Sequence, residues 1–148
     1  MNRRDLLAGM GTVVAAAVVR AAVAAEPQPH DHTHMHSMAK YQTLIDTASQ
    51  CVNTGEICLD HCHLSLADGD KTLGECARSV SELIAACTTL RSLAAQESKF
   101  LPKYAKLTME VCKSCEAACR KHEKAHAQCK DCADACAACA KVCDQIPA

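Results

Sequence analysis

The sequence predicts an all-α protein, an antiparallel up-down four-helix bundle with a cysteine-lined core. Apolar and cysteine residues recur at intervals of three, four and seven over four long windows, which is the period of an amphipathic helix. Turn and capping signals separate most of these windows, and short connections place successive helices antiparallel. A chain of 148 residues suits one such domain with appendages.

The first 24 residues are typical of a twin-arginine export signal. Arg3 and Arg4 precede an apolar, alanine-rich run over residues 9–19, and residues 22–24 (Ala-Val-Ala) offer a cleavage site. The alternative is a membrane anchor, but the run is shorter than the roughly 20 residues that span a bilayer. We therefore expect export to the periplasm or another extracytoplasmic compartment, and a mature form without a membrane segment.

Residues 25–38 are predicted to be a disordered, histidine-rich linker, because they contain two prolines and no apolar periodicity. Histidines occupy every second position from His30 to His36. Imidazole binds copper and zinc, so a weak, exchangeable site on this linker is one interpretation. A solvated tail without metal is the other.

The bundle is predicted over residues 39–146, and its first helix over residues 39–67. The inward face of this helix carries Leu44, Cys51, Cys58 and Cys62. Gly55 lies on the same face, where it allows close approach of a neighbour. Residues 68–70 (Asp-Gly-Asp) are a turn signal that ends the helix.

The second helix is predicted over residues 71–95. Its inward face is an ordinary bundle stripe with two cysteines in it: Cys76, Val80, Leu83, Cys87, Leu90 and Ala94. A short connection follows, and Pro102 suits the first turn of the next helix.

The third and fourth helices are predicted over residues 102–124 and 127–145. On the third, the inward face carries Leu101, Tyr104, Thr108, Cys112, Cys115 and Cys119. The segment between the two helices has neither Gly nor Pro, so one continuous helix of more than 40 residues is the alternative. We favour a break because four helices of similar length close a bundle.

The fourth helix carries the densest cysteine pattern. Its five cysteines recur at intervals of three, four, three and four: Cys129, Cys132, Cys136, Cys139 and Cys143. On a helix they fall within an arc of about 80°. The same intervals occur seventeen residues earlier, where histidine takes the last two places: Cys112, Cys115, Cys119, His122 and His126. This repetition indicates a repeated ligand pattern.

The thirteen cysteines predict a metal-binding core rather than a disulfide scaffold. Their number is odd, and most are spaced along helical faces, where only some pairs reach disulfide geometry. Thiolates select Cu(I), zinc and iron–sulfur clusters. Cu(I) needs two or three shared thiolates, and about one thiolate per ion leaves a buried core neutral. We therefore expect storage of about 10–15 Cu(I) ions per chain.

Three alternatives remain open. Cys112-x2-Cys115 and Cys129-x2-Cys132 resemble zinc-ribbon pairs, which would make this a zinc-buffering protein, but they lie in helix-forming sequence. An iron–sulfur protein is suggested by the dense fourth helix, although the spacing departs from the ferredoxin pattern. A dithiol redox protein is favoured least, since no strand is visible.

The expected metal ligands are all thirteen cysteines and two histidines: Cys51, Cys58, His61, Cys62, Cys76, Cys87, Cys112, Cys115, Cys119, His122, Cys129, Cys132, Cys136, Cys139 and Cys143. His61 lies at the edge of the inward arc, and a surface histidine is its alternative interpretation. His63 and His126 are left without an assigned role. Met109 is expected to pack rather than to bind metal.

Composition excludes other functions. Without residues 1–24 the chain has thirteen basic and sixteen acidic side chains, a net charge of −3 with histidine neutral. No basic patch and few aromatic residues argue against binding of nucleic acid. No nucleophile–base pair is visible, and a metal-filled core leaves no substrate cleft, so we expect no enzymatic activity.

The chain resembles the bacterial copper storage protein family, especially exported members from methane-oxidising bacteria. The resemblance spans residues 41–143 and is carried by Cys112-x2-Cys115-x3-Cys119-x2-His122, by the five-cysteine run that follows, and by Gly55-Glu-Ile-Cys-Leu-Asp-His-Cys62. It implies a four-helix bundle filled with Cu(I), a homotetramer, and supply of copper to an acceptor that is a copper chaperone or a copper enzyme. Exported relatives use methionines near the open end of the bundle, whereas this chain has none around residues 65–73.

Overall fold

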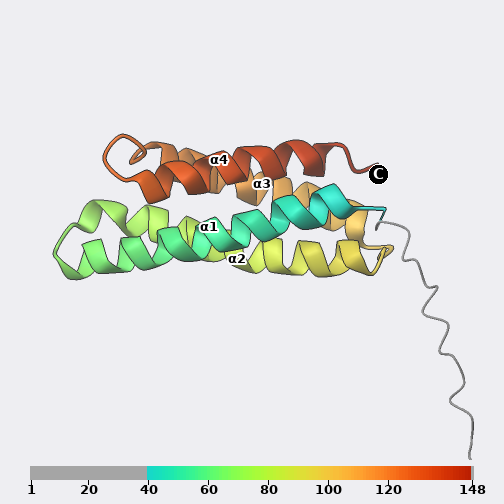
Figure 1. Ribbon diagram of the computed structural model, residues 1–148, viewed down its shortest axis with the longest axis horizontal. Helices are drawn as coiled ribbons and strands as arrows, with labels where there is room; N and C mark the ends of the chain where they lie inside the picture. The colour runs from blue at the N-terminus through green and yellow to red at the C-terminus, as the bar shows by residue number, and fades with distance from the viewer. Residues whose placement is uncertain (1–39, 148) are drawn as a thin grey trace, which may run out of the picture. The chain divides into compact units, whose positions relative to one another are not determined.

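The computed structural model describes residues 40–147, which form a bundle of four α-helices (Figure 1). Helix α1 spans Gln42–Ala67, α2 Gly74–Ala95, α3 Leu101–Arg120 and α4 Ala127–Asp144, and a short 3-10 helix, η1, covers Lys71–Leu73. The described residues contain no strand. The predicted export signal and linker lie outside the described residues.

The helices pack in the order α1, α2, α3, α4 around one axis, because each contacts its neighbours in sequence and α4 also contacts α1. This arrangement confirms the predicted antiparallel up-down bundle. The α1–α2 and α3–α4 connections lie together at one end, called here the turn end (left in Figure 1). The opposite end, with the α2–α3 connection, is called the terminal end. Across residues 40–147, no helix has the combined length and apolar character that a membrane span requires.

The connection between α1 and α2 follows from its turn residues. Gly69 adopts a φ of +96°, a left-handed conformation that glycine reaches without strain. Asp70 then caps η1, because its Oδ1 accepts hydrogen bonds from the Thr72 backbone N (3.0 Å) and hydroxyl (2.6 Å). The first turn of the predicted second helix is therefore 3-10 rather than α-helical.

The connection between α3 and α4 is longer than the sequence indicates, because α3 ends earlier while α4 begins at the expected residue. α3 ends at Arg120, four residues before the expected end, and residues 121–125 form turns. Arg120 donates across the connection to Asp134 on α4 (2.7 Å), and His126 adopts an extended conformation as the residue before α4. These contacts hold a break that Gly or Pro does not mark, and the chain does not form one continuous helix.

The core changes character along the bundle axis. Near the terminal end it is filled by apolar side chains, called here the apolar half: Leu44, Ala48, Leu90, Ala94, Leu101 and Ala105. From the middle to the turn end it is lined mainly by cysteines, called here the thiol half. Val80 and Leu83 of α2 are also buried there. Gly55 permits close packing of α1 on α2, since a Cβ at this position would lie 3.0 Å from Ile84 Cγ1.

Candidate metal centre

All thirteen cysteines lie in the described residues, and each is a free thiol with at most 1% of its surface exposed. α1 contributes three, α2 two, α3 three and α4 five. The helical spacing places them on inward faces, where the four stripes meet along one axis. The sequence-predicted thiols therefore share one buried environment.

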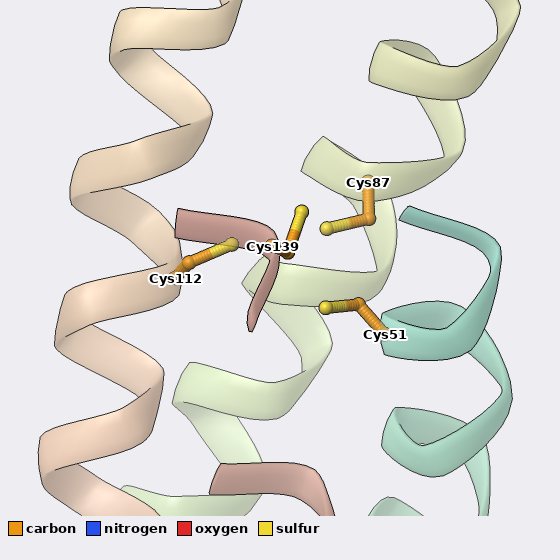
Figure 2. A group of neighbouring side chains, drawn as sticks. All are labelled: Cys51, Cys87, Cys112 and Cys139. Atoms are coloured by element: carbon orange, nitrogen blue, oxygen red, sulfur yellow. The ribbon is translucent and has the colours of Figure 1, made fainter. Parts of the chain in front are cut away.

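One set of four thiols forms a single layer near the middle of the bundle (Figure 2). This middle layer takes one cysteine from each helix: Cys51, Cys87, Cys112 and Cys139. The four sulfurs lie within 4.8 Å of one another. Figure 2 shows the thiols converging from the surrounding helices on a common centre.

A second set of four thiols lies closer to the turn end. This turn-end group consists of Cys58, Cys62, Cys76 and Cys129, and it shares no residue with the middle layer. The Sγ atom of Cys129 lies 3.9 Å from that of Cys58 and 3.9 Å from that of Cys76. Such separations allow a shared metal ion, because two thiolates on one ion are a similar distance apart.

Two sets of three thiols extend the turn-end group further into the core, and neither shares a residue with the middle layer. One comprises Cys58, Cys119 and Cys132, and the other Cys115, Cys132 and Cys136. Because Cys58 and Cys132 each belong to two sets, the thiols from the turn end to Cys136 overlap without a gap. The Cys76 and Cys119 sulfurs, 3.4 Å apart, form a further link across the core. Cys143 lies outside these sets, one helical turn beyond Cys139 towards the terminal end.

Burial and hydrogen bonds between the thiols together control their protonation. Burial and the neighbouring Cys76 raise the pKa of the Cys129 thiol to about 12. In contrast, Cys115 and Cys119 donate hydrogen bonds to the sulfur of Cys132 and lower its pKa below the usual range. A thiol network of this kind holds most of its protons at neutral pH, so metal binding must displace them.

Histidines lie beside the turn-end group. The Nε2 atom of His61 is 2.8 Å from Nδ1 of His126, which joins α1 to the connection before α4. The ring of His122 lies 6.3 Å from that of His126, between centroids. All three are half-buried, whereas His63 is exposed. The sequence alone assigns no role to His126, although the repeated spacing of three, four, three and four ends on it.

Met109 is half-buried and packs against the core from α3. This placement agrees with packing as its role.

A family model described as copper storage protein matches residues 37–148, a range that contains all four helices and every cysteine. The chain belongs to the copper storage protein family. Membership implies copper storage. The clustered, buried thiols fit this function, because thiolates are soft ligands that bind copper well. The family is one of storage proteins rather than enzymes. Among curated proteins, none matches this chain significantly.

Proposed function

We propose that this bundle stores about 10–15 copper ions per chain, held as Cu(I) on core thiolates. The observation that carries the proposal is the series of overlapping thiol groups from the turn end to Cys136, followed closely by the middle layer. Overlap favours sharing of sulfurs between ions, which lets a set of thirteen thiols hold a similar number of ions.

Charge favours Cu(I) as the stored form. Each Cu(I) that binds a thiol displaces one proton, so a filled core of equal numbers of Cu(I) and thiolate is neutral. A core filled instead with divalent ions on four thiolates each would gather negative charge away from water, which is costly. That cost grows with each further divalent ion, so it weighs most on a fully loaded core.

The ligands in this proposal are the thirteen cysteines together with His61 and His122 at the turn end. His61, His122 and His126 are half-buried and lie near one another at the turn end, which supports entry of copper from that side. We add His126 to these proposed ligands, because its Nδ1 lies 2.8 Å from Nε2 of His61.

The cellular setting is also part of the proposal. The twin arginine at Arg3 and Arg4 supports export of the folded protein, and a bundle folded in a reducing compartment keeps its thiols free. The family resemblance supports a homotetramer. The stored copper is supplied to copper enzymes, directly or through a chaperone, or is withheld as detoxification.

An anaerobic Cu(I) titration of the reduced protein, with a chromophoric Cu(I) chelator as competitor, tests the storage function. Free thiols are counted beforehand. We expect about thirteen thiols and an endpoint of about ten or more equivalents. An endpoint of a few equivalents would contradict storage and indicate a discrete site.

A further inference from the structure

The middle layer differs from the other thiol groups in how the helices supply it. Each of the four helices contributes one cysteine to it (Figure 2). The turn-end group takes two cysteines from α1 and none from α3. A single ion bound by the middle layer would therefore cross-link all four helices at one level.

The spacing of these sulfurs fits one tetrahedral ion. A Zn–S bond of about 2.3 Å places the sulfurs of a tetrathiolate about 3.8 Å apart. In the middle layer the sulfurs lie within 4.8 Å of one another, so an inward shift of about 1 Å or less per edge closes the tetrahedron. All four thiols are fully buried, which excludes water as a competing ligand.

A buried hydroxyl supplies a second, independent observation. Thr108 Oγ1 is fully buried and has no hydrogen-bond partner. Thr108 lies one helical turn before Cys112 on the inward face of α3. An unpaired hydroxyl in a core is destabilising, and a negatively charged thiolate nearby would accept its hydrogen bond. The hydroxyl of Thr108 is thus an unused donor one helical turn from the middle layer, available to a thiolate that moves into reach when metal binds.

We propose that the middle layer of the copper-free protein binds one divalent, thiophilic ion of the Zn²⁺ class. Binding breaks four S–H bonds, forms four metal–sulfur bonds and releases four protons. The resulting tetrathiolate carries a charge of −2, and Thr108 donates a hydrogen bond to it. The ion holds the four helices together where the apolar half ends.

Copper loading then removes this ion, a step that rests on the proposed function. Four Cu(I) ions replace one divalent ion on the same four thiolates, and no electron is transferred. The layer changes from a charge of −2 to neutral, which favours the exchange in a buried core. The divalent ion is therefore a placeholder that stabilises the bundle before copper arrives.

Co²⁺ is the probe for this site, because thiolate-bound tetrahedral Co²⁺ has intense visible bands and a sulfur-to-cobalt charge-transfer band. The whole chain is titrated anaerobically in the presence of a non-thiol reductant. We expect both spectral features to saturate at one equivalent and to disappear when Zn²⁺ is added. Histidine-bound Co²⁺ gives no sulfur band, so binding by the linker histidines is distinguishable.

Two cysteine variants locate the site. Cys87→Ser removes a ligand of the middle layer and should abolish the tetrahedral signature. Cys62→Ser removes a ligand of the turn-end group and should leave it unchanged. Loss of the signal in Cys62→Ser, or its persistence in Cys87→Ser, would overturn the assignment to the middle layer.

Thr108→Val supplies a variant that should fold without difficulty. Removal of an unpaired hydroxyl should raise the melting temperature of the metal-free protein, while loss of its hydrogen bond should weaken Co²⁺ binding about tenfold. An unchanged affinity would overturn the role of Thr108. If wild type shows no tetrahedral signature, the placeholder proposal fails, and a separate Cu(I) titration still reports on storage.

Discussion

The apolar half and the thiol half of the core are built from the same four helices but have different fillings. Leucines and alanines fill the apolar half, and their burial stabilises the helix packing without a ligand. Cysteine contributes less apolar surface than leucine, so the thiol half is weakly stabilised when empty. The apolar half therefore maintains the fold without a ligand, whereas the thiol half has side chains suited to binding metal.

The largest effect should come from loading the thiol half. Copper that binds only the folded protein stabilises it by about 4 kcal/mol for each independent site at a free concentration 1,000 times the Kd. We therefore expect the Cu(I)-loaded bundle to melt far above the copper-free form in calorimetry. Hydrogen exchange should slow most around Cys58 and least around Leu44. Equal melting temperatures would place the metal outside the core.

The next effect compares two neighbouring positions on α2. Leu90 is fully buried in the apolar half, so Leu90→Ala should destabilise the copper-free protein by about 2–5 kcal/mol and leave its copper capacity unchanged. Cys87→Ala should cost only about 1 kcal/mol and lower the capacity. Urea unfolding and Cu(I) titration measure the two quantities. A loss of capacity in Leu90→Ala that persists in folded protein would remove the distinction between the halves.

A smaller effect concerns pH and the thiol half alone. The Cys129 thiol titrates near 9.0 in the unfolded chain, whereas burial raises its pKa to about 12 in the bundle. Between these two pH values the folded protein keeps a proton on Cys129 that the unfolded chain has lost. The stability that this thiol contributes is therefore fully present below about pH 9 and declines as the pH rises towards 12. Chemical unfolding of the reduced protein at several pH values measures the decline. The decline of stability with pH should be smaller in Cys129→Ala. An equal decline in that variant would mean that other groups cause it.

Proton displacement also sets the pH dependence of copper binding. Each thiol that gives up a proton to Cu(I) should weaken the apparent affinity about tenfold for each pH unit of acidification. Competition with a chelator at two pH values below the thiol pKa measures the slope. An affinity independent of pH would mean that the ligands are not protonated thiols.

The smallest effect should be seen at the turn end. His61→Ala removes the contact with His126, which is half-buried, and should cost about 1 kcal/mol or less. It should slow copper uptake without a large change in capacity. His63→Ala is the matched control, because His63 is exposed nearby on α1 and should leave uptake unchanged. Equal uptake rates in both variants would exclude His61 from the path of copper.

The fold could be predicted because its signals are local to each helix. The cysteine spacing on α4 alone indicated one inward face, and the structure buries all five of these thiols. The end of α3 could not be predicted in the same way. It depends on contacts between segments, such as Arg120 with Asp134 and His61 with His126, and no Gly or Pro marks it.

The grouping of the thiols into layers also could not be predicted from the sequence. Periodicity shows that Cys51 and Cys87 face inward, but not that they meet Cys112 and Cys139 in one layer. That meeting depends on the axial register of four helices, which the connections and the packing of side chains such as Ile84 on Gly55 determine.

Anomalous diffraction at the copper edge from crystals of the loaded protein tests the central claim most directly. The account predicts copper peaks along the thiol half, from the turn-end group to the middle layer, with each ion within bonding distance of cysteine sulfur. It also predicts no copper among Leu44, Leu90 and Leu101. Copper confined to surface carboxylates or histidines, with the core thiols unliganded, would contradict it.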